Sequence, residues 1–260
     1  MFSKADTHIH TTYSDGLMTP QEVIDYVAQH TDLSVIAITD HETAEGAFIA
    51  QAYARQYAPQ LDVIIGQEIS TEDGDVVGLF LNSTLPVCKT AAEAIEAIHA
   101  HNGLAIAVHP FSRWVSCNYL KGVGDKVFAL PFDGIEVRNG VPANVICNPV
   151  TKWFNRRAKN SRAELGGSDS HVSFTVGQPY TRFPGRTADD FRWAVRDGTV
   201  QAGGFVWSPK SLLHLIPVLQ KRGTPVQQHA MVKANQAKQQ FRPGSDHTQR
   251  DSVGRPATIG

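Results

Sequence analysis

The sequence predicts an α/β fold built on a parallel sheet, either open or closed into a barrel. Short apolar runs alternate with segments of helical periodicity over about 200 residues, a pattern typical of such sheets. Histidines and carboxylates stand repeatedly at the ends of the predicted strands. In a parallel barrel the carboxyl ends of the strands carry the chemistry, so this placement indicates one functional site at that end.

The composition is that of a globular protein. Of the 260 residues, 42% are hydrophobic and 19% are charged, which supplies a buried core. The formal net charge of −1 excludes a strongly basic protein that binds nucleic acid mainly by counterion release. No apolar run approaches the ~18 residues of a membrane-spanning helix, and Asp6 precedes any apolar run, so we expect neither a membrane segment nor a secretory signal. Three cysteines without a CxxC pair favour a cytoplasmic location.

The chain changes character at residue 222. Residues 222–260 contain no Leu, Trp or Tyr, include six Gln and carry a charge of +4, which leaves −5 for residues 1–221. Such a segment is too poor in apolar surface to offset the entropy of ordering. We therefore expect one domain over residues 1–221, followed by a disordered polar tail; a basic arm that touches an anionic polymer is the alternative.

Apolar runs predict the strands. Those without polar alternation indicate strands buried on both faces, and they cover residues 35–38, 63–65, 76–80, 104–108 and 134–137. A first strand ends in Asp6-Thr7-His8-Ile9-His10, and a last one precedes Asp169-Ser170-His171.

Helices are predicted from their capping signals. Thr19-Pro20-Gln21-Glu22 combines an N-cap threonine, a proline at the first helical position and a capping-box glutamate. Thr90-Ala91-Ala92-Glu93 repeats the capping box, and Thr187 with Asp190 opens a third helix. The apolar positions after each start share one helical face. Residues 142–162 are also predicted to be helical.

Imidazole and carboxylate groups follow strands in five separate segments. His8 and His10 point to the same face of an extended chain and can hold one cation. The other candidates are Asp15, on the loop after the first strand, His41, Glu68, His109, Asp169 and His171. Clustered carboxylates without a cation would cost several kcal/mol in repulsion and desolvation, which predicts a polynuclear metal site.

The donor atoms restrict the metal. Nitrogen and oxygen donors exclude a thiolate-type structural zinc site and fit Mn²⁺, Fe²⁺ or Zn²⁺. Eight donor residues exceed what one ion needs, so at least two ions are expected. Glu68 and Asp169 are the candidates for bridging them.

Taken together, these segments resemble the PHP (polymerase and histidinol phosphatase) family. The resemblance rests on Asp6-Thr7-His8-Ile9-His10, Ser14-Asp15-Gly16, Ile38-Thr39-Asp40-His41, Gly66-Gln67-Glu68, Val108-His109-Pro110 and Gly167-Ser168-Asp169-Ser170-His171. It covers residues 5 to about 172. It implies a distorted, TIM-like seven-stranded (β/α) barrel in which two or three divalent metals cleave phosphate esters. The segment from Thr39 to Gly46 is most similar to the stand-alone phosphoesterases, which include enzymes acting on nucleotide phosphates and RNA 5′ ends.

The resemblance also implies how the ligands divide among metals. One set is His8, His10, Glu68 and Asp169; a second is Asp15, His41 and His171; at a third site His109 would join Glu68. Many relatives place a histidine shortly after the glutamate segment, where this chain reads Asp73-Gly74-Asp75. Asp75 is therefore either a substitute oxygen ligand or a hairpin-turn aspartate.

A mechanism follows from two neighbouring ions, which lower the pKa of a shared water and neutralise phosphoryl charge. We expect a metal-bound hydroxide to attack phosphorus in line, without a covalent intermediate. Asp169 and His171 are candidates for orienting water or protonating the leaving oxygen. Arg138 and Arg113 are candidates for binding phosphate oxygens. Asn139-Gly140 is typical of a turn.

The predicted function is hydrolysis of a phosphomonoester or phosphodiester, with a nucleotide or an RNA 5′ end as substrate. The expected partners are a small phosphate ester or a short oligonucleotide, without membrane or stable duplex DNA binding. Alternatives are a histidinol-phosphate phosphatase, a metal-dependent amidohydrolase and a non-catalytic PHP binding module. The sequence lacks a P-loop, a GxSxG nucleophile motif and a GxGxxG motif after a strand.

Overall fold

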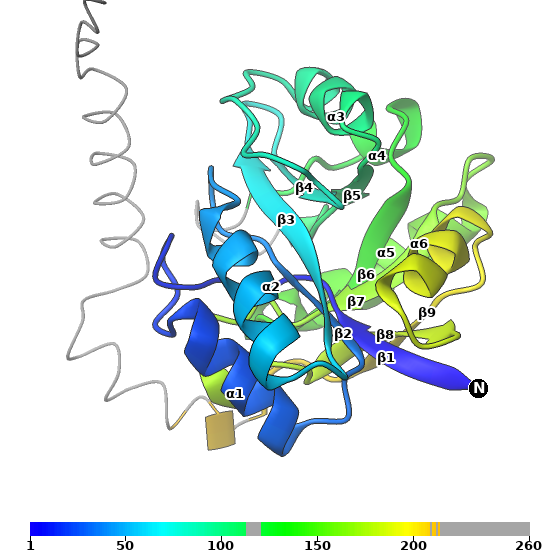
Figure 1. The fold of residues 1–260 in the computed structure, drawn as a ribbon. Coiled ribbons are helices and arrows are strands. Elements are labelled where there is room, and N and C mark those ends of the chain that lie inside the picture. Colours follow the sequence, from blue (N-terminus) through cyan, green and yellow to red (C-terminus); the bar gives the residue numbers. More distant parts are fainter. Residues whose placement is uncertain (113–120, 209, 212, 214–260) are drawn as a thin grey trace, which may run out of the picture.

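The computed structural model describes residues 1–112, 121–208, 210, 211 and 213. In this part of the chain, nine strands form one sheet in the order β7-β6-β5-β4-β3-β2-β1-β8-β9 (Figure 1). The strands are β1 (Phe2–Asp6), β2 (Val35–Ile38), β3 (Asp62–Ser70), β4 (Asp75–Leu79), β5 (Leu104–Ala107), β6 (Gly134–Asn139), β7 (Ala163–Gly167), β8 (Pro179–Pro184) and β9 (Gln201–Gly204).

Six helices and two 3-10 turns accompany the sheet in the described residues. They are α1 (Pro20–His30), α2 (Glu45–Tyr57), α3 (Ala91–Ala100), α4 (Lys126–Ala129), α5 (Cys147–Arg157), α6 (Ala188–Arg196), η2 (Pro142–Val145) and η3 (Ser173–Thr175). None of these helices has the length and apolar character needed to cross a membrane. The predicted polar tail, residues 222–260, lies outside the described residues.

The sheet forms a nearly closed, distorted barrel, as predicted. Strands β1, β2 and β3 are parallel to one another, as are β5, β6 and β7. A parallel bridge between Ile9 and Ser170 joins the chain beyond β1 to the chain beyond β7. The carboxyl ends of these six strands therefore meet at one end of the barrel.

Strand β4 departs from the parallel pattern predicted from strand–helix alternation. It pairs antiparallel with both β3 and β5. The connection from β3 to β4 is a tight turn, closed by hydrogen bonds between Thr71 and Gly74. A turn this short joins only antiparallel strands, because a parallel connection needs a crossover of a dozen or more residues.

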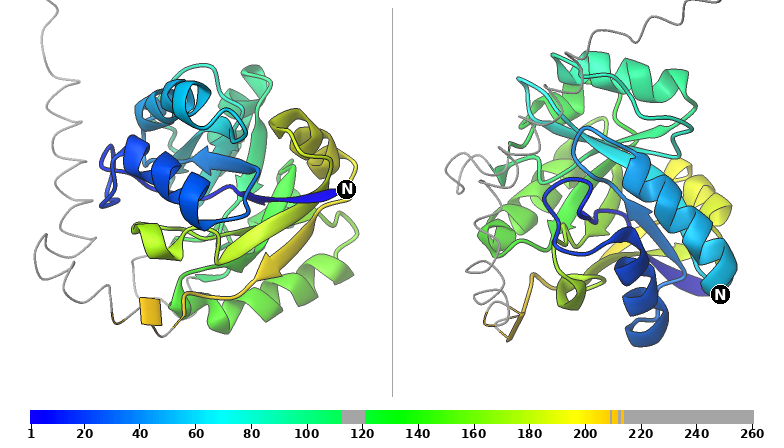
Figure 2. Two further views of the ribbon diagram at one scale, coloured as in Figure 1. Left: turned by 60° about the horizontal axis from the view of Figure 1, so that its bottom comes forward. Right: turned by 60° about the vertical axis from the view of Figure 1, so that its left-hand side comes forward.

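Side chains on both faces of the sheet are buried, as the unbroken apolar runs predicted. In β2, Ile36 and Ile38 belong to a cluster that also contains residues of α1, α2 and α3. Val35 and Ala37, on the opposite face, belong to a second cluster with α6. Figure 2 shows α1 and α2 side by side on the outside of the sheet. Helices α1, α2 and α3 thus pack on one face of the sheet and α6 on the other.

The three helices predicted from capping boxes are present. Thr19, Thr90 and Thr187 each accept a hydrogen bond from the backbone N–H three residues ahead, and the acidic residue there bonds back to the threonine N–H. The segment predicted as helical over 142–162 contains η2 and α5.

We expect Thr90→Ala to lower the free energy of unfolding by about 1 kcal/mol, because the Glu93 N–H loses its acceptor at the start of α3. The melting temperature should fall by about 2–4 °C. Thermal unfolding followed by circular dichroism measures this change. Thr90→Ser keeps the hydroxyl acceptor and should stay close to wild type; an equal loss in both variants would contradict a capping role.

Candidate metal centre

The predicted ligand segments converge at the end of the barrel where the parallel strands terminate. His8 and His10 follow β1, His41 follows β2, His109 follows β5, and Asp169 and His171 follow β7. Glu68 lies near the end of β3, and a parallel bridge pairs it with His41. These positions are adjacent because neighbouring parallel strands end at the same edge of the sheet.

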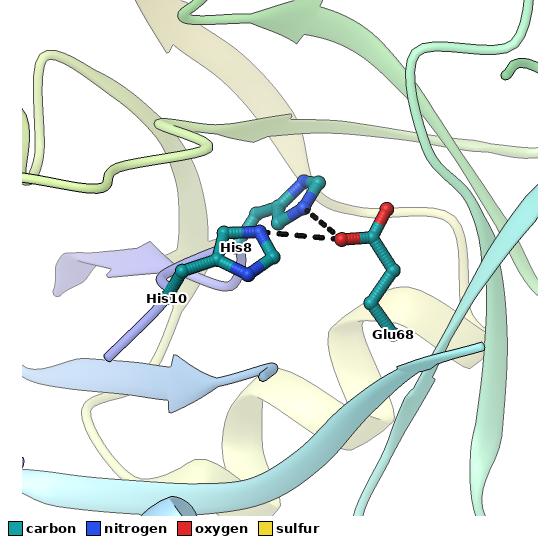
Figure 3. Close-up of side chains that lie close together, drawn as sticks. All are labelled: His8, His10 and Glu68. Carbon is teal, nitrogen blue, oxygen red and sulfur yellow. Dashed lines mark hydrogen bonds and ion pairs between the residues drawn. The ribbon is translucent and has the colours of Figure 1, made fainter. Parts of the chain in front are cut away.

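Glu68 is at the centre of the cluster. Its Oε2 atom lies 3.3 Å from His8 Nε2 and 3.2 Å from His10 Nε2 (Figure 3). Its Oε1 atom lies 3.3 Å from His109 Nε2. Asp169 Oδ1 approaches the same two histidines, at 3.3 Å from His10 Nε2 and 3.6 Å from His8 Nε2. Two carboxylates and three imidazoles thus surround one small volume.

A second group forms around Asp15. Its Oδ2 atom lies 3.2 Å from His171 Nε2 and 3.9 Å from His41 Nε2, and its Oδ1 atom lies 3.6 Å from His10 Nδ1. The His10 ring stacks between those of His41 and His171, with centroids 4.7 and 4.4 Å away. His10 therefore stands between the Asp15 group and the Glu68 group.

Asp75 lies at the same end of the barrel, although it begins a strand whereas the other ligands lie near or beyond the ends of strands. It is the first residue of β4, and because β4 runs antiparallel to β3, its start lies beside the end of β3, with Asp75 opposite Ser70. Donor atoms of Asp75, Glu68 and His109 lie within 4.8 Å of one another. The structure thus brings all nine predicted ligands together, Asp75 included.

Of the two predicted phosphate-binding arginines, the structure describes Arg138 alone. Arg138 Nη1 donates a 2.6 Å hydrogen bond to the Gly204 carbonyl, which joins β6 to β9. Arg113 lies outside the described residues. Their substrate roles stay predictions.

The site is deeply buried, with one more open side. The side chains of His8, His10 and Glu68 are at most 2% exposed, whereas those of His41 and His171 are 14% and 16% exposed. Solvent therefore reaches the cluster most readily at His41 and His171.

The carboxylates of the cluster raise the pKa values of its buried histidines and so favour their protonated forms. Burial alone would lower the pKa of His10, but the Asp169 and Glu68 carboxylates raise it to about 10. Burial likewise opposes the charged forms of Glu68 and Asp169, yet the surrounding histidines hold the pKa values of both carboxyls low. Burial, aided by Glu68, raises the pKa of Asp75 to about 7. The metal-free site thus takes up protons where a dication would supply the charge.

The geometry fits divalent metal. His10 Nε2 and Glu68 Oε1 have charged neighbours within 3.3 Å, but neither these atoms nor His10 Nδ1 make a hydrogen bond to any described residue. Buried polar atoms in this state are expected where a ligand binds. Two donors bound to one ion at ~2.1 Å are about 3.0–3.4 Å apart, close to the separations around Glu68. The protein can therefore bind divalent metal at this centre.

Two of the candidate ligands have unusual backbone conformations. His109 has φ 31° and Asp169 has φ 52°, in the left-handed region that residues other than glycine seldom adopt. Such conformations persist only when surrounding contacts enforce them, and they cluster at functional sites. Here the His109 N–H donates to Glu136 Oε2 at 2.9 Å.

Sequence reasoning missed the roles of three buried residues, Asp40, Glu136 and Asn139, that hold the ligands in place. Asp40 accepts hydrogen bonds from the Thr11 N–H and from the Ser14 hydroxyl, which fixes the loop that carries Asp15. Glu136 lies 3.2 Å from His8 Nδ1. A glutamate inside a buried apolar strand was the available signal for it.

The interpretation of Asn139-Gly140 as merely a turn was wrong. Asn139 is the last residue of β6, is fully buried, and its Nδ2 donates to Glu136 and to Asp169. Its side chain therefore belongs to the centre.

Comparisons with known proteins agree with this arrangement. The family profile described as PHP domain matches residues 6–127, and one described as PHP-associated matches residues 155–200. An uncharacterized protein of Methanocaldococcus jannaschii is 36% identical over 171 residues, which cover 60% of this chain and 95% of that protein.

Shorter matches connect the chain to two named enzymes. A 5′-3′ exoribonuclease of Haemophilus influenzae is 31% identical over 41% of this chain and 39% of that protein. A 3′,5′-nucleoside bisphosphate phosphatase of Chromobacterium violaceum is 36% identical over 35% of this chain and 32% of that protein. A solved structure from Bacteroides vulgatus, described as a two-domain protein containing a predicted PHP-like metal-dependent phosphoesterase, has TM-score 0.66 at 19% identity. The match covers 79% of this chain and 65% of that one, and it shows the same fold.

Proposed function

The chain belongs to the PHP domain family, and on this premise we propose that it is a metal-dependent phosphoesterase acting on nucleotide phosphates or RNA 5′ ends. The observation that carries the proposal is the convergence of nine imidazole and carboxylate side chains, with Glu68 and Asp15 among them, at one end of the barrel. The matches to an exoribonuclease and a nucleoside bisphosphate phosphatase support a nucleotide-containing substrate.

The ligands divide into overlapping sets suited to two or three ions. One ion would be held by His8, His10, Glu68 and Asp169, a second by Asp15, His41 and His171, and a third by Glu68, Asp75 and His109. Mn²⁺, Fe²⁺ and Zn²⁺ all accept this mixture of nitrogen and oxygen donors. Bound divalent ions would lower the pKa of water and neutralise charge on the phosphoryl group.

Hydrogen bonds to neighbouring groups orient the histidines for this task. His171 Nδ1 lies 3.0 Å from the Asp169 carbonyl oxygen. Because a carbonyl oxygen only accepts, this nitrogen carries the proton, and the Nε2 lone pair of the neutral ring points toward Asp15. The backbone of one proposed ligand thus selects the tautomer of another.

Proton transfer and phosphate binding are assigned to four residues. Asp169 would orient the attacking water. His171 would protonate the leaving oxygen in a state in which its Nε2 carries a proton and is not bound to metal, because its Nδ1 donates to the Asp169 carbonyl. Arg138 and Arg113 remain the proposed phosphate-binding residues, with part of the Arg138 guanidinium already bonded to Gly204.

A substrate panel tests the proposed function. Protein loaded with Mn²⁺ should release phosphate or mononucleotides from nucleoside bisphosphates or from oligoribonucleotides with a 5′ phosphate, and chelation should abolish the release. Histidinol phosphate, sugar phosphates and amide substrates complete the panel. Hydrolysis of histidinol phosphate or of an amide alone would favour the corresponding alternative. Metal-loaded protein that hydrolyses none of the panel would contradict the proposal.

A further inference from the structure

Glu136, a buried residue of β6, contacts two of the proposed metal ligands, His8 and His109. It is 3% exposed and faces the cluster from β6. Its Oε1 atom lies 3.2 Å from His8 Nδ1, and its Oε2 atom accepts hydrogen bonds from the His109 N–H and from Asn139 Nδ2, both at 2.9 Å. A carboxylate in this position has only acceptors, so it requires a proton on His8 Nδ1 and leaves His8 Nε2 toward Glu68 and Asp169.

Asn139 extends this network to a third proposed ligand. Its Nδ2 donates to Glu136 Oε2 and, at 3.1 Å, to Asp169 Oδ2. Asp169 Oδ2 is thereby bonded on one side, while Oδ1 faces His8 and His10. The Asn139 side chain is itself fixed, because its Oδ1 accepts from the Val141 N–H and from Asn144 Nδ2.

A β-bulge places these two side chains on the same face of β6. In a regular strand, residues three apart point to opposite faces. Here Glu136 pairs with Leu165 while Arg138 pairs with the next residue, Gly166, so one extra residue of β6 shifts the alternation. Bulges of this kind re-aim side chains beside functional sites.

We propose that Glu136 and Asn139 form a positioning pair that sets the tautomer of His8 and the orientation of the Asp169 carboxylate for metal binding. The inference rests on the metal centre of the proposed function. Neither residue is itself a proposed metal ligand. Glu136 contacts His8 and His109, and Asn139 contacts Asp169, so both would act on the metal through these ligands. Outer partners of this type typically change metal affinity by about 10- to 100-fold when replaced.

The packing around Glu136 supports a role that requires close approach. Gly167 in β7 lies against Glu136 and His8, and a Cβ at this position would collide with Glu136 Oε1 and with the Cβ of His8. The backbone of β7 therefore closes the site behind the Glu136–His8 contact. A side chain at this position would displace the Glu136 carboxylate from its contact with His8.

Glu136→Gln tests the proposal with little change in shape. If the amide oxygen faces the His109 and Asn139 donors, the amide NH₂ faces His8 Nδ1 and forces the proton onto His8 Nε2. If the amide is turned, its NH₂ meets two other donors. We expect the dissociation constant for Mn²⁺, measured by titration calorimetry on chelator-treated protein, to rise about 10- to 100-fold. Mn²⁺ bound per chain at fixed free metal should fall accordingly.

Glu164→Gln is the matched control. Glu164 lies on the adjacent β7, where it pairs in register with Ile135, but its carboxylate contacts Lys152 and Arg156 instead of the centre. Mn²⁺ affinity should stay at the wild-type value in this variant. Asn139→Ala should weaken Mn²⁺ binding too, and the double variant should lose less than the product of the two single losses, because the residues act as one unit.

Melting temperatures in chelator separate positioning from stability. A purely structural role would lower the melting temperature of Glu136→Gln but leave the Mn²⁺ affinity of its folded form at the wild-type value, and that result would overturn the proposal. Wild-type protein that binds Mn²⁺ without hydrolysing any ester would defeat the proposed function and leave this inference standing. Wild-type protein without Mn²⁺ affinity would overturn both.

Discussion

Asp169→Asn is expected to reduce phosphate ester hydrolysis more than about 100-fold, because replacing an outer partner alone typically costs about 10- to 100-fold and Asp169 is a proposed ligand. The asparagine keeps the shape of the side chain and tolerates the left-handed backbone of this position better than most residues. Asn139 donates to Asp169 Oδ2, so the new amide oxygen would turn toward Asn139 and its NH₂ toward His8 and His10. A donor then faces the cation.

Steady-state rates with saturating Mn²⁺ measure the effect, with the bound metal determined on the same samples. Asp197→Asn, at the exposed C-cap of α6, makes the same chemical change away from the centre and should leave the rate unchanged. Near-ultraviolet circular dichroism should be preserved in both variants. Asp169→Asn protein with more than about a tenth of the wild-type rate would remove Asp169 from the proposed ligand set.

The sequence predicted the helices and strands that carry strong local signals. Capping boxes marked α1, α3 and α6, and unbroken apolar runs marked the buried strands. Helix α2 has no side-chain cap at Ala44, and its buried positions are small residues such as Gly46 and Ala47, so its apolar face is weak. Strand β9 reads Gln-Ala-Gly-Gly and has no apolar pattern. Its place is set by pairing with β8 and by packing against β7.

The ligand cluster was predictable because each segment follows a strand, and parallel strands bring such segments together. The role of Asp75 depended on the direction of β4, which strand–helix alternation did not indicate. The placement of the Glu136 and Asn139 side chains on one face depended on the bulge in β6. A period of two places these residues on opposite faces, so no reading of the sequence by alternation would join them. The sequence pattern around each strand thus predicted most of the proposed metal ligands. The residues that position them could not be predicted, because they depend on the bulge in β6.

Removing metal should destabilise the protein more as the pH rises. In the metal-free state the pKa values of His8, His109 and His171 are raised by carboxylates against the effect of burial, and that of His10 is raised from 6.5 to about 10. A group whose pKa is higher in the folded state binds protons more tightly there, so its stabilisation is complete below the unfolded value and is lost as the pH rises through the folded one. The chelated protein should therefore lose stability between pH 6.5 and about 10.

The lowered pKa values of Asp15 and Glu68 act in the opposite direction at acid pH. Their stabilisation is present above the unfolded values of 3.8 and 4.5 and is lost as the pH falls below them. Asp6 and Asp75, whose pKa values are raised from 3.8 to about 6 and about 7, act like the histidines: their stabilisation is lost as the pH rises through those values.

Metal reverses the trend above pH 6.5, because it needs the histidines deprotonated and competes better as protons become scarce. Free Mn²⁺ at 100 times its dissociation constant stabilises the folded state by about 2.7 kcal/mol, which corresponds to about 5–11 °C at ~2–4 °C per kcal/mol. Melting temperatures measured with Mn²⁺ and with chelator should therefore diverge from pH 6 to 8.5. His10→Ala, which removes the ring between the Glu68 and Asp15 groups, should close most of that gap. A gap that narrows as the pH rises would show that the histidines at the barrel end do not bind the metal.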